Sequence, residues 1–78
     1  SDDLIKEIET IVESGTKLNL QYMLDNMIDD YEQEELSDFF KESEHFSLEE
    51  ARREFLEDDY SDEELRIARI QFISEVGN

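Results

Sequence analysis

The stretch FSLEEARREFLEDDYSDEELRIARIQF, residues 46–72, uses one six-residue pattern twice, as FSLEEA from Phe46 and as YSDEEL from Tyr60. In each copy the serine hydroxyl can accept a hydrogen bond from the amide three residues on, while the second glutamate can reach back to the serine amide. Each copy therefore predicts a helix start. With a turn of three or four residues around Glu57–Asp59, the two helices would have the outline of a helix-turn-helix.

The first part of the chain also favours helices. Its apolar residues recur at helical spacing, as Leu4, Ile5, Ile8, Ile11 and Val12. Asp2 or Asp3 can cap this helix, and Gly15 can close it in a left-handed conformation. Asn19 can cap a second helix, which carries Leu24 and Ile28.

Asp29 or Asp30 can cap a third helix, from about Glu32 to Glu42, with Leu36, Phe39 and Phe40 facing inward. In the fourth helix the residues expected on one inward face are Leu48, Ala51, Phe55 and Leu56. No proline and no alternating strand pattern compete with this interpretation. The expected fold is therefore all-α: residues 1–78 form one compact bundle of about five short helices with a helix-turn-helix-like C-terminal pair.

The fifth helix is apolar on more than one side. Five of its residues cluster on one side of the helix, namely Leu65, Ala68, Phe72, Ile73 and Val76, whereas Ile67 and Ile70 lie well around the cylinder. Such a helix is either central in the bundle or presents a second face to a partner. Ile67 and Ile70 are therefore a candidate docking surface.

The charge balance opposes contact with anionic surfaces. The chain has 24 aspartates and glutamates against 7 lysines and arginines, which gives a formal net charge of −17. Non-specific nucleic-acid affinity requires lysines and arginines that displace counterions from phosphates. The apolar runs are too short for a bilayer span, and the absence of cysteine favours a cytoplasmic location.

The residues offer no recognisable catalytic or metal site. No 12-residue window has the ligands and glycine of a calcium-binding loop, and no glycine-rich loop could bind a nucleotide phosphate. His45 is the only histidine and is expected in a loop, where it has no partner for zinc binding or catalysis. We expect no enzymatic activity and no cofactor in this chain.

DNA reading by the last helix is a second possibility. Four of the seven basic residues lie in the last two helices, and Arg52, Arg53, Arg66 and Arg69 are the candidate DNA contacts. However, the residues that would face base edges are Asp62, Glu63 and Glu64. These acids favour a helix start but would repel a duplex.

Three runs of the chain resemble the C-terminal helix-turn-helix-like domain of bacterial RecQ-family ATP-dependent DNA helicases: IETIVESGTKLNLQYMLDNMID from Ile8, LSDFFKES from Leu36 and YSDEELRIARIQFISE from Tyr60. The resemblance extends from about Leu4 to Asn78. It implies a longer parent enzyme that hydrolyses ATP with magnesium and unwinds DNA in the 3′ to 5′ direction in recombination and repair. No helicase motif occurs here, so no catalytic, nucleotide or metal residue is carried over.

Three hypotheses follow. The chain is a non-catalytic accessory domain that docks on the rest of its parent helicase or on another protein, without membrane contact. Alternatively, it binds DNA directly through the four arginines. A free-standing acidic adaptor is the third possibility, which a parent gene without an ATPase would favour.

Overall fold

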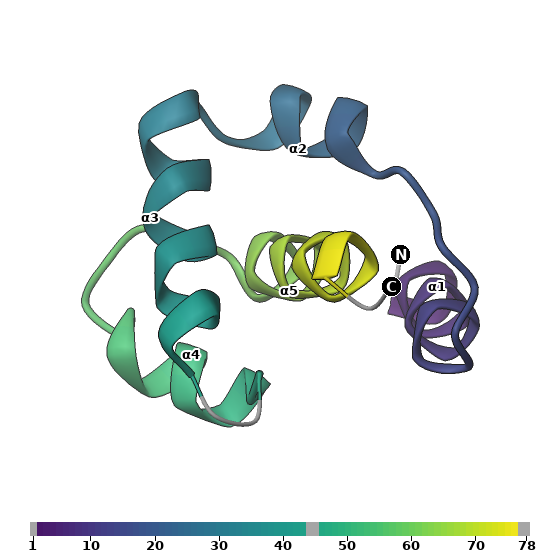
Figure 1. Ribbon diagram of the computed structural model, residues 1–78. Helices are drawn as coiled ribbons and strands as arrows, with labels where there is room; N and C mark the ends of the chain where they lie inside the picture. The colour runs from purple at the N-terminus through teal and green to yellow at the C-terminus, as the bar shows by residue number, and fades with distance from the viewer. Residues whose placement is uncertain (1, 44–45, 77–78) are drawn as a thin grey trace.

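The computed structural model describes residues 2–43 and 46–76, and this part of the chain forms five helices and no strand (Figure 1). The helices are α1 (Asp2–Glu13), α2 (Gln21–Met27), α3 (Asp30–Glu42), α4 (Leu48–Glu54) and α5 (Asp62–Val76). The expected all-α bundle is confirmed. His45 lies outside the described residues.

Within the described residues both serines of the repeated start signal act as caps, and the predicted reciprocal bond to the glutamate forms in the second copy but not in the first. Ser61 Oγ accepts a hydrogen bond from the Glu64 amide at 3.1 Å, and the Ser61 amide donates to the Glu64 carboxylate at 2.8 Å. Ser47 Oγ accepts from the Glu50 amide at 3.2 Å. Asp29 caps α3 with the same reciprocal pair of bonds. Because these bonds satisfy amides that the first turn leaves free, they determine locally where three helices begin.

The connection between α4 and α5 is longer than predicted. It comprises residues 55–61, because Phe55 caps α4 and the Asp58 amide then donates to the Phe55 carbonyl at 3.1 Å, which adds a further turn. Leu56 lies in this turn and is 78% exposed, so its predicted inward position was wrong.

Two of the predicted helix boundaries in the first part of the chain also differ. Asp2 and Asp3 lie inside α1 rather than before it. Leu20 takes the position directly before α2, while Asn19 lies one residue further out and its side chain accepts a hydrogen bond from the Gln21 amide at 3.0 Å.

Gly15 closes α1 as predicted. Its φ of 102° lies in the left-handed region, which glycine enters without a steric penalty. The Gly15 amide donates to the Val12 carbonyl at 3.0 Å and the Thr16 amide to the Ile11 carbonyl at 3.3 Å. This pair of bonds is a Schellman motif, and it turns the chain away from α1 toward α2.

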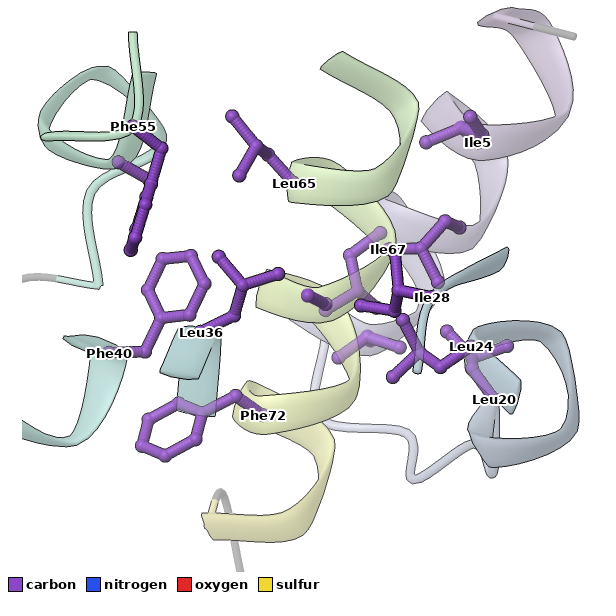
Figure 2. Packing of buried hydrophobic residues seen from close by; sticks show 14 residues of the cluster. Ile5, Leu20, Leu24, Ile28, Leu36, Phe40, Phe55, Leu65, Ile67 and Phe72 are labelled. Atoms are coloured by element: carbon purple, nitrogen blue, oxygen red, sulfur yellow. The ribbon is translucent and has the colours of Figure 1, made fainter. Parts of the chain in front are cut away.

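Helix α5 is the centre of the bundle. Each of the other four helices packs against it, and Figure 1 shows α5 nearly end-on with α1, α2, α3 and α4 arranged around it. Figure 2 shows the two sides of its core: Phe40, Phe55 and Phe72 lie toward α3 and α4, while aliphatic residues of α1 and α2 lie on the other side. The central position explains why α5 is apolar on more than one side.

Candidate nucleic-acid interface on α4 and α5

The four candidate arginines come from two neighbouring helices but face different surroundings. Arg52 and Arg53 lie on α4, and Arg66 and Arg69 lie on α5. Arg66 and Arg69 bind carboxylates of α1, whereas Arg52 binds the first residue of α5. Three of the four arginines are therefore paired with carboxylates of the chain itself.

Arg52 clamps the start of α5. Its Nε and Nη2 donate to the two carboxylate oxygens of Asp62 at 2.7 and 3.0 Å, and its Nη1 donates to Glu49 at 2.9 Å. The hydrogen bond from Arg52 holds the pKa of Asp62 below its usual range, and the same bond raises the pKa of Arg52. Both side chains are about half exposed, so this pair contributes at most about 1 kcal/mol to stability.

The ion pair of Arg66 is less exposed than that of Arg52. Arg66 Nε and Nη2 donate to the two carboxylate oxygens of Glu9 at 3.2 and 2.7 Å, which ties α5 to α1 across 57 positions of sequence. The two side chains are only 12% and 15% exposed. A phosphate could reach this guanidinium only if the buried pair first opened, which would leave Glu9 without its partner.

Arg69 positions the segment before α4. Its Nε donates to the Phe46 carbonyl at 2.6 Å, and its Nη2 lies 3.4 Å from the Glu13 carboxylate. Phe46 has a φ of 49°, an uncommon conformation for a residue other than glycine, and its ring packs on Phe72 at 5.4 Å. The bond from Arg69 therefore fixes a strained residue at the entrance to α4.

Arg53 is exposed, but its surroundings are acidic. It lines a groove of about 590 Å³ between the end of α3 and α4, together with Phe39, Ser43 and three glutamates, Glu42, Glu50 and Glu54. The three carboxylates outnumber the single guanidinium. An approaching phosphate would meet a net negative rim at this groove.

The first turn of α5 is acidic, as the sequence predicted. Asp62 accepts the bonds from Arg52, Glu64 completes the cap with Ser61, and Glu63 is exposed. The carboxylates of all three residues lie near the positive end of the helix dipole, where negative charge stabilises the helix. A basic residue that could contact a base edge is absent from this turn.

The predicted docking surface of Ile67 and Ile70 was wrong. Both side chains are 1% exposed, because helices pack against α5 on both of its apolar sides. Figure 2 shows Ile67 directed toward the aliphatic side of the core, near Ile28 and Leu24. A partner protein cannot contact either isoleucine while the domain is folded.

One exposed feature was missed when the sequence was considered alone. The outer face of α3 carries Tyr31, Glu34, Glu35 and Asp38, which together line a shallow hollow. The signal was present, because the chain has no lysine or arginine between Lys17 and Lys41.

The described residues were also compared with the requirements of a metal site and of a membrane-spanning helix. Among residues 2–43 and 46–76, no group of three histidine, cysteine, aspartate or glutamate side chains is placed to hold a metal ion. Within the same residues, no helix is both long and apolar enough to cross a membrane.

Residues 1–24 match the family model of the RecQ-1-like, helix-turn-helix domain. The match covers α1, the Gly15 turn and the first residues of α2. No curated protein matches the chain. The predicted resemblance to a RecQ-family helix-turn-helix-like domain is therefore confirmed over this stretch.

Proposed function

We propose that this chain is the non-catalytic accessory domain of a RecQ-like, ATP-dependent 3′–5′ DNA helicase that acts in recombination and repair, and that it works by docking on a basic protein surface. The rest of the parent enzyme is the first partner to consider. ATP and magnesium would be bound by that parent, outside this chain. The family match supports the RecQ relationship. The pairing of the arginines with the chain's own carboxylates supports docking on a protein rather than on DNA.

The single observation that carries the proposal is that the domain already uses its arginines internally. Arg52, Arg66 and Arg69 bind the chain's own carboxylates, and Arg53 lies among three glutamates. Binding phosphates through these residues would require several ion pairs to open in a molecule of net charge −17. Direct DNA contact is therefore the less favourable alternative.

The remaining charge favours a basic protein surface. The acids that no arginine binds give the domain a negative field, which accelerates encounter with a positively charged partner and discourages DNA from staying bound. Helicases bind DNA in positively charged channels, so a domain docked near such a channel would compete with the DNA backbone. The accessory domain could in this way gate access to DNA within one enzyme.

The DNA alternative is tested by fluorescence anisotropy. Labelled single-stranded, duplex and forked DNA are titrated with the chain at about 50 and about 200 mM salt, because phosphate contacts lose affinity steeply over this range. We expect no binding at micromolar protein. Salt-sensitive binding that disappears when Arg52, Arg53, Arg66 and Arg69 are all replaced by alanine would overturn the proposal in favour of the DNA-binding module.

Docking is tested with the helicase of the parent gene, prepared without this segment. The chain is added in trans, and binding is measured by calorimetry while unwinding of forked DNA is followed. We expect binding that weakens with salt and a change in unwinding rate. Absence of both effects, or a parent gene that encodes no ATPase, would favour a free-standing adaptor instead.

A further inference from the structure

Helices α2 and α3 are rich in acids and carry no basic residue before Lys41, in the last turn of α3. Between Lys17 and Lys41 there are seven acidic residues and no basic ones: Asp25, Asp29, Asp30, Glu32, Glu34, Glu35 and Asp38. The arginines described above bind carboxylates of α1, α4 and α5 instead. In the described part of the chain, seven acids that bind no arginine therefore follow one another along α2, the turn before α3 and α3, and the first base after them is Lys41, three positions beyond Asp38.

The outer face of α3 combines this charge with an exposed aromatic ring. Tyr31 is 76% exposed at the start of the helix, and Glu34, Glu35 and Asp38 follow at three, four and seven positions, on the same face. The four residues line one hollow of about 350 Å³. We call these four residues the α3 outer face.

One carboxylate of this face is held in position. Glu35 accepts a hydrogen bond of 2.6 Å from the hydroxyl of Tyr60, whose ring packs on Phe55 in the core at 5.3 Å. Glu35 therefore loses little side-chain freedom when a partner binds it, which lowers the entropic cost of contact. Glu34 and Asp38 flank it and are exposed.

We infer that the α3 outer face is a docking surface for an arginine-bearing segment of a partner protein. The inference rests on the proposed function and specifies its partner chemistry. A guanidinium is planar, so it can stack on the exposed ring of Tyr31 while its N–H groups donate in pairs to a neighbouring carboxylate. A lysine ammonium lacks this planar fork. A second copy of the chain does not fit, because the same face would meet another molecule of charge −17.

The first test compares two double variants of equal charge. Glu34→Gln with Asp38→Asn removes two carboxylates of the α3 outer face, and Glu57→Gln with Asp59→Asn removes two exposed carboxylates of the α4–α5 turn. The probe is a short labelled peptide of alternating arginine and serine. We expect about fivefold weaker binding for the first variant and less than about twofold for the second. Equal losses would overturn the inference, because the peptide would then respond to net charge alone.

The second test separates stacking from charge. Tyr31→Ala should weaken the arginine peptide severalfold, whereas Tyr22→Ala, which removes a tyrosine that is 67% exposed on α2, should not. A lysine peptide of the same spacing should bind the unaltered chain more weakly than the arginine peptide. Equal binding of the two peptides, or equal effects of the two tyrosine variants, would contradict arginine stacking. Far-ultraviolet circular dichroism checks that each variant is folded.

The same variants distinguish failure of this inference from failure of the proposed function. If the parent helicase binds the chain but the α3 variants bind it normally, docking stands and the α3 outer face is the wrong surface. If the arginine peptide binds the α3 outer face but the parent helicase does not bind the chain, the surface stands and the helicase partner is wrong.

Discussion

At the scale of single residues, two arginine pairs have the same geometry in different environments. Arg66 with Glu9 and Arg52 with Asp62 are both two-bond pairs. The side chains of the first pair are 12% and 15% exposed, and those of the second are 41% and 51% exposed. Removing one carboxylate of a buried pair leaves a desolvated charge, whereas water replaces a lost partner at the surface. Burial therefore decides how much each pair contributes to the free energy of unfolding.

Glu9→Gln should lower the free energy of unfolding by about 2 kcal/mol, because Arg66 loses a charged acceptor in a mostly buried position. Asp62→Asn is the matched control, since it also removes one negative charge from a two-bond arginine pair. Its expected cost is below about 1 kcal/mol. Urea unfolding followed by circular dichroism measures both. Equal losses would show that burial does not separate the two pairs.

At the scale of elements, the segment between α1 and α2 is held by side chains of α5. The Ser74 hydroxyl accepts from the Leu18 amide at 2.9 Å and donates to the Leu18 carbonyl at 2.6 Å. Gln71 accepts from the Leu20 amide at 2.6 Å. Both polar side chains are buried, at 4% and 6% exposure. They satisfy the backbone of a segment that has no helix or strand of its own.

Ser74→Ala should therefore lower the free energy of unfolding by about 1 to 2 kcal/mol, because the Leu18 amide and carbonyl lose their partner. Hydrogen exchange at Leu18 should also accelerate more than exchange in the middle of α5. Ser14→Ala is the control, since that exposed hydroxyl only donates to the Ile11 carbonyl within its own helix end. A Leu18 amide that exchanges at an unchanged rate in Ser74→Ala would show that Ser74 does not hold this segment.

The elements also show which features can be predicted from sequence. Caps and turns such as Ser61 with Glu64, Asp29 and Gly15 depend on residues within one helical turn, so pattern alone located them. Whether Ile67 and Ile70 faced a partner or the core could not be decided in that way. The answer depends on how many helices surround α5, which is a property of the assembled bundle.

The candidate site was harder to predict for the same reason. The pairs of Arg66 with Glu9 and of Arg69 with Glu13 join residues more than fifty positions apart, and no local pattern signals them. Locally, Glu63 and Asp62, three and four positions before Arg66, were equally available as its partners. The acidic first turn of α5, in contrast, could be read directly from the sequence.

At the scale of the whole molecule, the charges lie close enough to repel one another throughout. The domain measures about 31 by 27 by 21 Å and carries a net charge of −17. At about 10 mM salt the screening length is about 30 Å, so charges interact across the full width, whereas at about 0.5 M only close neighbours interact. Unfolding moves the charges apart, and low salt should therefore destabilise the folded state.

We expect the melting temperature to rise by several degrees between about 10 mM and about 0.5 M sodium chloride, because screening relieves repulsion among 24 acids while it weakens only a few ion pairs. Thermal unfolding followed by circular dichroism measures the change. Choline chloride is the control: a similar rise indicates screening, and a rise with sodium alone indicates specific cation binding. A falling melting temperature would mean that the arginine pairs outweigh the repulsion. In that case repulsion among the acids would not dominate the electrostatics of the domain, which would count against docking on a basic partner through its negative charge.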